Sequence, residues 1–213
     1  MLKTPFQVQQ PLRIVLVRHG ESEHNVADCM SGYADTPLSE NGIVQASAVA
    51  ERLKCEQFTH AYTSDLSRAK STAEAILRHH TCQLEVQERV RERCFGAFEG
   101  RAAKLYYEDR GRWTGLLKDY TPPEGGESLH MLRERVAPFV SDVIRSHGEA
   151  GGTILIAAHG SFNCTFTQVL FDLDYQERSH LTQGNTCVNQ FELYPDRGVC
   201  LVCFNCQEHL EKS

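Results

Sequence analysis

The 213-residue sequence lacks several features that would assign it to a specialised class of protein. It has no uninterrupted apolar run of about 18 residues, so we expect no membrane-spanning helix. The first eleven residues, MLKTPFQVQQP, have neither the apolar core nor the small-residue cleavage site of a secretory signal. No internal repeat, low-complexity tract or Pro/Ser-rich linker divides the chain. We therefore predict a single domain over residues 1–213, with residues 1–11 as a short N-terminal tail.

Charge and cysteine content narrow the expected setting and partners. The formal net charge is −6 and no segment carries a dense basic stripe, so nucleic acid is not an expected partner. A small anionic substrate is still allowed, because it responds to local charge rather than to the total. The nine cysteines are an odd number and most lie in apolar segments. This favours reduced thiols and a cytoplasmic location, away from membranes, and leaves the oligomeric state open.

Apolar runs bounded by turn residues predict six strands. Residues 12–17 form a near-continuous apolar run, as expected of a strand covered on both faces. The segment GTILIAAHG gives the clearest strand, and the last two strands flank the turn PDRG as a hairpin. Besides GTILIAAHG, the other strands are expected at 58–63, 83–87, 188–194 and 199–204.

Helical periodicity separates most of these strands. One helix is expected to begin after the N-cap Ser39 and to bury Ile43, Ala46, Ala50 and Leu53. The next helix has Ser64 or Asp65 as its cap. A third runs through residues 129–143 and should kink or restart at Pro138. A fourth is expected over SFNCTFTQVLF, directly after the clearest strand.

This order of elements predicts an α/β fold. Strands that alternate with helices form a mostly parallel central sheet with helices on both faces, which is a three-layer sandwich. In such sheets ligands bind at the carboxyl ends of the strands. Chemically active side chains are therefore expected at that edge.

Two strands end in the same polar motif. LVRHG and IAAHG each place His-Gly directly after an apolar strand, at His19 and His159. Parallel strands of one sheet would bring these two histidines to the same edge. The following glycines, Gly20 and Gly160, would allow a backbone to approach a ligand closely.

Two arginines give this edge the charge of a phosphate site. Arg18 precedes His19, and Arg68 lies in the first turn of its predicted helix, off the apolar face. Helix N-termini attract anions, and the planar guanidinium binds two phosphoryl oxygens at once. The sequence therefore predicts a cationic pocket shaped for a phosphoryl group.

Four motifs, in this order and at these separations, carry a family resemblance: RHGESEHN, SDLSRAKSTAE, RERCFGAFEG and AHGS. With them, residues 12–204 resemble the histidine phosphatase (phosphoglycerate mutase-like) superfamily. Within it, FTHAYTSDLSRAKSTAEAIL, TPPEGGESL and the ending CFNCQEHL are most similar to the fructose-2,6-bisphosphatase-like group, which includes TIGAR-like phosphatases.

The resemblance implies a mechanism for hydrolysis of a phosphoric monoester. His19 would attack phosphorus and form a phosphohistidine, which splits one difficult step into two. Glu92, in RERCFGAFEG, would protonate the leaving oxygen and later take a proton from water. The phosphoryl oxygens would be held by Arg18, Asn25, Arg68, His159 and Gly160.

The resemblance also bears on substrate and cofactor. The expected partner is a small phosphorylated metabolite, either a sugar bisphosphate such as fructose-2,6-bisphosphate or a phosphoglycerate. Residues 101–126, rich in large aromatic side chains, would form a helical cap that sets specificity. The family's mutases typically have more sequence here, so this short cap favours hydrolysis. No carboxylate cluster has magnesium-ligand spacing, and we expect neither metal nor cofactor.

Three alternatives remain open at this stage. The first is a cofactor-dependent phosphoglycerate mutase. The second is a phosphoprotein phosphatase or a non-catalytic phosphate-binding module of the same fold. The third concerns the thiols: CLVCFNC hints at zinc, although buried small hydrophobes explain it better, and oxidation of Cys94 or Cys164 would slow the enzyme if these residues lie near the site.

Overall fold

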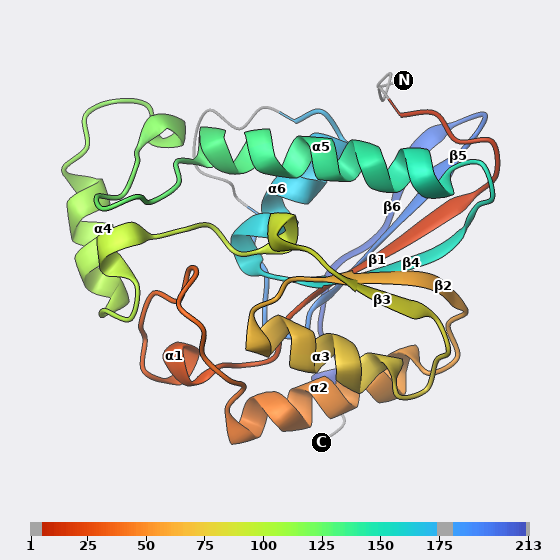
Figure 1. Cartoon of the computed structure of the whole chain (residues 1–213), viewed down its shortest axis with the longest axis horizontal. Helices are drawn as coiled ribbons and strands as arrows, with labels where there is room; N and C mark the ends of the chain where they lie inside the picture. The colour runs from red at the N-terminus through yellow and green to blue at the C-terminus, as the bar shows by residue number, and fades with distance from the viewer. Residues whose placement is uncertain (1–5, 174–180, 212–213) are drawn as a thin grey trace.

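The computed structural model describes residues 6–173 and 181–211 and places six strands in one sheet (Figure 1). Their order is β3-β2-β4-β1-β5-β6. The first four strands in this order are mutually parallel, whereas β5 is antiparallel to β1 and β6 is antiparallel to β5. The strands are β1 Leu12–Arg18, β2 Phe58–Thr63, β3 Gln83–Val86, β4 Gly152–Ala158, β5 Val188–Tyr194 and β6 Gly198–Cys206. The predicted mostly parallel sheet and the final hairpin are confirmed.

Helices cover both faces of the sheet, as predicted. In Figure 1, α5 and α6 lie above the sheet and α2 and α3 lie below it. Alternation along β1 explains this arrangement, because successive strand residues point to opposite faces. No helix in the described ranges has the length and apolar character needed to cross a membrane. The bounds are α2 Glu40–Leu53, α3 Ser67–Leu77, α5 Leu129–His147 and α6 Gly160–Leu170.

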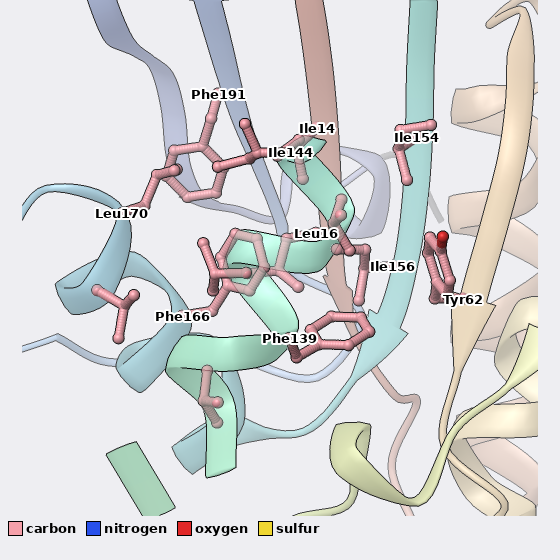
Figure 2. Close-up of a cluster of buried hydrophobic side chains, with 14 of the residues drawn as sticks. Ile14, Leu16, Tyr62, Phe139, Ile144, Ile154, Ile156, Phe166, Leu170 and Phe191 are labelled. Carbon is pink, nitrogen blue, oxygen red and sulfur yellow. The ribbon is translucent and has the colours of Figure 1, made fainter. Parts of the chain in front are cut away.

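Each face of the sheet has its own hydrophobic cluster. Ile14 and Leu16 of β1 pack with α5 and α6, and Figure 2 shows Phe139 and Phe166 pointing from these helices toward the strands. On the other face, Val15 and Val17 pack with a cluster that includes Val49, Leu53 and Ile76 of α2 and α3. The central strand is therefore apolar at every position between Ile14 and Val17.

The buried face of α2 differs from the predicted one by Ile43, which is 57% exposed. Ser39 is the N-cap, as expected, and its side chain accepts the Gly42 N–H. Gly42, rather than Ile43, faces the protein because a Cβ at Gly42 would lie 1.9 Å from the Glu21 carbonyl oxygen. This close approach fixes the rotation of the helix and turns Ile43 to solvent.

Two other predictions about the helices are wrong, namely the cap of α3 and a restart of the helix at Pro138. The N-cap of α3 is Leu66, without a side-chain cap bond, because Ser64 and Asp65 bind elsewhere: Ser64 contacts His159 and Asp65 pairs with Arg91. α5 continues through Pro138. Pro138 is exposed, so the carbonyl that loses its helical partner there can be hydrated.

The predicted tail and cap contain ordered parts. Residues 1–5 lie outside the described ranges, but Val8 is buried and packs on the cluster of α5 and α6. Residues 101–126 contain α4 (Ala103–Gly111) and a short 3-10 turn at Leu117–Asp119. Their aromatic side chains form a separate cluster with residues 95 and 98, consisting of Phe95, Phe98, Tyr106 and Tyr120.

A large-to-small substitution in the core measures its contribution to stability. Phe166→Ala removes a fully buried ring that packs beside Phe162 and Phe191. We expect the free energy of unfolding to fall by about 3–5 kcal/mol, because the site cannot collapse around the cavity. Urea denaturation followed by circular dichroism measures it. Ile43→Ala is the matched control and should change stability by about 0.5 kcal/mol at most. A loss in Ile43→Ala as large as that in Phe166→Ala would mean that Ile43 is buried and that the exposed face of α2 is assigned wrongly.

Candidate active site

The two histidines that follow β1 and β4 lie side by side. β1 and β4 are parallel neighbours, and their register sets Arg18 opposite Ala158. His19 and His159 are the next residues at the carboxyl edge of the sheet, and their ring centroids are 5.1 Å apart. Both side chains are buried. The structure thus brings together the two strand-His-Gly motifs.

His19 is held in the form that a nucleophile requires. Its Nδ1 lies 2.7 Å from the carbonyl oxygen of Gly20. Because a carbonyl only accepts, Nδ1 carries the proton and Nε2 keeps its lone pair. Burial, with the charges of Arg18 and Arg68, lowers the pKa of His19 well below its usual value. The ring is therefore neutral at physiological pH.

His159 is oriented by Ser64. The Nε2 of His159 lies 2.7 Å from Ser64 Oγ, which also accepts the Leu66 N–H at 3.3 Å. The hydroxyl can then donate to Nε2, which leaves the ring proton on Nδ1. This Nδ1 is buried and has no hydrogen-bond partner among the described residues. Burial and the charge of Arg68 lower the pKa of His159 well below its usual value, so the ring offers a neutral donor.

Arg18 and Arg68 bring two guanidinium groups to the histidines, and main-chain carbonyls hold both. Arg18 donates to Gln183 O at 2.6 Å, and Arg68 donates to Gly32 O at 2.8 Å and Ala34 O at 3.1 Å. The Nε of each arginine is buried without a partner in residues 6–173 and 181–211. Burial lowers the pKa of both side chains from the usual value, and the charge of Glu92 opposes this. Neutral carbonyls position these cations without cancelling their charge.

Glu92 reaches the same edge from the segment before the cap. Both of its carboxylate oxygens lie 3.1 Å from the Ser161 N, and Oε1 also accepts the Arg93 N–H at 2.7 Å. A Cβ built on Gly160 would lie 3.6 Å from Glu92 Oε2 and 3.7 Å from Arg18 Nε. The carboxylate therefore lies at the start of α6, next to Arg18.

An ion pair fixes the main chain around Glu92. Arg135 of α5 donates to both carboxylate oxygens of Glu127 at 2.8 Å. Its guanidinium also donates to the carbonyls of residues 89, 91 and 92, at 2.8, 3.0 and 3.0 Å. Glu127 Oε2 in turn accepts the Cys94 N–H at 3.0 Å. Neither Arg135 nor Glu127 was singled out from the sequence, because their role depends on contacts distant in the chain.

A second carboxylate, Glu99, holds the loop that binds Arg68. It accepts the N–H groups of Tyr33 and Phe95 at 2.9 Å and of Ala34 at 2.8 Å. Gly32 has a φ of +53°, and a Cβ there would lie 2.1 Å from Glu99 Oε1. Glycine is therefore required for this loop to present its carbonyl groups to Arg68.

Asn25 is placed beside His19 by a residue that sequence analysis missed, Asn185. Asn25 Oδ1 accepts the Ser22 N–H at 3.1 Å and the Asn185 side-chain N–H at 3.3 Å. Asn185 also donates to the His19 carbonyl at 3.2 Å. The pairing of β5 with β1 would have identified Asn185. Since β5 is antiparallel to β1, the loop before β5 lies at the carboxyl end of β1. The sequence predicted the hairpin but not this pairing.

Gly20, which follows His19, packs closely against α2. A Cβ at Gly20 would lie 2.5 Å from the Gly42 carbonyl oxygen, so this packing requires a glycine. At Gly160 a Cβ would meet its neighbours only at ordinary contact distance. That the two glycines let a backbone approach a ligand closely stays a prediction.

Two of the thiols considered from the sequence, Cys94 and Cys203, are affected by burial. Burial raises the pKa of Cys94 to about 11, so this thiol stays protonated at neutral pH. Cys203 of CLVCFNC also has a raised pKa through burial. Within the described ranges, no three His, Cys, Asp or Glu side chains are grouped to hold a metal ion.

The buried histidines predict a pH dependence of stability. Their pKa values are lowered from 6.5, so below that pH the unfolded chain takes up protons that the folded chain does not. The free energy of unfolding should fall with decreasing pH, by up to about 1.4 kcal/mol per pH unit for each histidine. Urea titrations from neutral pH to about pH 5 measure this slope. His19→Asn should flatten it, whereas the exposed control His79→Asn should not. Equal slopes for wild type and His19→Asn would show that His19 titrates normally.

Relatives of the chain include both mutases and phosphatases. A Photorhabdus laumondii protein named "Probable phosphoglycerate mutase GpmB" is 36% identical over 197 residues, which is 81% of this chain and 89% of that protein. The 2,3-bisphosphoglycerate-dependent phosphoglycerate mutase of Mesorhizobium japonicum is 36% identical, covering 70% of this chain and 76% of its own. The structure of a mycobacterial glucosyl-3-phosphoglycerate phosphatase has a TM-score of 0.81 and 28% identity, covering 92% of this chain and all of that one.

The family model that matches is that of the histidine phosphatase superfamily, branch 1, over residues 14–206. None of the three relatives above is named a fructose-2,6-bisphosphatase, so that finer resemblance stays a prediction. The match runs from β1 to β6 and includes both strand-His-Gly motifs, Arg68 and Glu92. The chain belongs to the histidine phosphatase superfamily, branch 1.

Proposed function

We propose that the protein is a phosphatase that hydrolyses small phosphomonoesters through a phosphohistidine on His19. One observation carries this proposal: a neutral His19, its Nδ1 held by the Gly20 carbonyl, lies in the field of two buried guanidinium groups. The unpartnered nitrogens of Arg18, Arg68 and His159 supply donors for phosphoryl oxygens. Such donors stabilise the charge that develops during phosphoryl transfer.

In the first step, the lone pair of His19 Nε2 attacks phosphorus and the ester P–O bond breaks. Glu92, entering the step as the neutral acid, gives its proton to the leaving oxygen. Arg18, Arg68 and the Nδ1–H of His159 would bind the three non-bridging oxygens. Asn25 and the Gly160 N–H are further proposed contacts.

In the second step, the Glu92 carboxylate takes a proton from water, whose oxygen attacks phosphorus. The P–N bond breaks, phosphate leaves and Nε2 regains its lone pair. The Gly20 carbonyl keeps the proton on Nδ1 throughout, so His19 returns to the reactive tautomer. The contacts of Arg135 keep the Glu92 backbone fixed for both proton transfers.

A phosphoglycerate mutase is the second candidate, supported by the names of the Photorhabdus and Mesorhizobium relatives. The first step is shared, and a mutase differs only in returning the phosphoryl group to an alcohol instead of water. The short cap at residues 101–126 favours the hydrolase. For substrate we propose a sugar bisphosphate such as fructose-2,6-bisphosphate, or a phosphoglycerate. Release from a phosphotyrosine peptide would favour a phosphoprotein substrate, and no release from any phosphorylated compound would favour a binding role without catalysis.

The proposal is tested by phosphate release from a panel without added metal. The panel contains fructose-2,6-bisphosphate, fructose-1,6-bisphosphate, 2,3-bisphosphoglycerate, 3-phosphoglycerate and a phosphotyrosine peptide. His19→Ala should abolish release, because it removes the nitrogen that carries the phosphoryl group in the proposed intermediate. Interconversion of 2- and 3-phosphoglycerate without net release would favour the mutase. Release that survives in His19→Ala would reject the mechanism.

The role of Glu92 is tested by the quality of the leaving group. Glu92→Gln should reduce kcat on an alkyl phosphate by about 10²–10⁴-fold, because the leaving alkoxide needs a proton. On 4-nitrophenyl phosphate the first step needs no acid, so the variant should give a burst of nitrophenol and accumulate phosphohistidine.

Glu88→Gln is the matched control, since Glu88 is an exposed acid of the same charged segment paired with Arg91. It should leave both reactions unchanged. Equal losses on the two substrates in Glu92→Gln, with no burst, would exclude Glu92 as the general acid.

A further inference from the structure

The loop at residues 183–186 forms three hydrogen bonds with Arg18 and His19. The Gln183 carbonyl accepts from Arg18 at 2.6 Å. Asn185 donates its side-chain N–H to the His19 carbonyl at 3.2 Å, and the Thr186 backbone N–H donates to the same carbonyl at 3.2 Å. The loop therefore sets the position of both residues of the Arg18-His19 pair.

The end of the chain holds this loop through three side chains. Asn205 Oδ1 accepts the Gly184 N–H at 2.7 Å, and Gln207 Nε2 donates to the Asn185 carbonyl at 2.8 Å. His209 Nε2 lies 3.0 Å from Thr186 Oγ1. We call Asn205, Gln207 and His209 the C-terminal clamp. They belong to the motif CFNCQEHL, which the catalytic steps above do not use.

His209 has a defined tautomer that suits this contact. Its Nδ1 lies 3.2 Å from Arg52 NH1 of α2, and arginine only donates, so Nδ1 accepts. Burial, with the charge of Arg52, lowers the pKa of His209 to about 4, and the ring is neutral. Nε2 therefore carries the proton and donates it to Thr186 Oγ1. That hydroxyl in turn donates to the Asn185 carbonyl at 2.8 Å.

His209 is anchored on α2, whereas Asn205 lies in β6 of the sheet. Arg52 also donates to the Cys206 carbonyl at 3.3 Å, and the short turn Glu208–Leu210 packs against α2. Thr186 has a φ of 52°, a strained value for a β-branched residue that surrounding contacts must hold. The β5–β6 ladder runs from Val188 to Cys206. The ladder can therefore persist when the clamp side chains are removed.

We propose that the C-terminal clamp positions Arg18 and His19 for phosphoryl transfer, acting through the 183–186 loop. The inference rests on the proposed function of this site. The clamp residues are positioning residues, since their contacts go to the loop rather than to the reacting atoms. Removing a contact leaves the phosphate-binding groups in place but less well aligned, so kcat should fall more than KM rises.

The test compares His209→Ala with Glu208→Ala, the matched control from the same turn with an exposed side chain. Hydrogen exchange of the Thr186 amide, followed by NMR, reports the loop directly and does not depend on turnover. We expect faster exchange in His209→Ala alone. We also expect kcat of phosphate release to fall about tenfold, with KM changed less than about twofold. His209→Gln restores a donor near Nε2 and should recover part of both effects.

Asn205→Gly is a second variant for the case that His209→Ala does not fold. Asn205 has a φ of 51°, which glycine adopts without strain, so this substitution removes the side chain while the backbone can stay the same. It should accelerate loop exchange while the melting temperature stays close to that of wild type. Unchanged Thr186 exchange in His209→Ala and Asn205→Gly would overturn the clamp. Faster exchange with unaltered kcat would overturn its positioning role.

Failure of the proposed function can be told apart from failure of the clamp. If wild type releases no phosphate from the panel, that function is wrong, and the readout becomes the affinity for orthovanadate. Weaker vanadate binding in His209→Ala than in Glu208→Ala would then support the positioning of Arg18 and His19. Equal binding would overturn it.

Discussion

The arrangement of the site depends on two buried guanidinium groups that are held by neutral carbonyls. A buried cation needs hydrogen-bond partners, and a carboxylate partner would cancel its charge. Arg18 and Arg68 instead bind the carbonyls of Gln183, Gly32 and Ala34. Their positive potential stays available at the sheet edge. Burial lowers the pKa values of His19 and His159, and the charges of these arginines lower them further. The choice of neutral partners therefore affects both the potential at the site and the protonation of its histidines.

Carbonyls can serve in this way only if the loops that carry them are fixed. Glu99 fixes the loop of Gly32 and Ala34, with its carboxylate placed on N–H groups rather than on Arg68 itself. The negative charge of Glu99 thus contacts the loop that holds Arg68 and not the guanidinium itself. Arg135 and Glu127 are arranged in a similar way. Their opposite charges neutralise each other, and the guanidinium of Arg135 also donates a hydrogen bond to the main-chain carbonyl of Glu92. The hydrogen bonds of Glu99, Arg135 and Glu127 can therefore hold the surrounding main chain without reducing the positive potential at the site.

The sequence predicted those parts that local pattern and strand order determine. His19 and His159 each follow an apolar strand, and parallel neighbours must bring such residues to one edge. Residues whose role depends on contacts distant in the chain were missed or misread. Ser64 was assigned as a helix cap because its local context permits a cap, but its hydroxyl binds His159 across 95 residues. Asn185 could not be placed without knowing that β5 pairs antiparallel with β1.

A hydrolase and a mutase differ in the second acceptor of the phosphoryl group. In the proposed mechanism both reactions pass through a phosphohistidine, so the phosphate-binding groups cannot choose between water and an alcohol as that acceptor. That choice must be made by whatever surrounds the leaving group, and α4 with its flanking turns is the candidate. This segment packs through its own aromatic cluster, separate from the two clusters of the sheet. The apolar packing of this segment is therefore not shared with the strands that lead to Arg18, His19 and His159. When the segment that contacts the substrate packs apart from the phosphate-binding residues, the substrate can vary among relatives while the phosphate-binding residues stay the same.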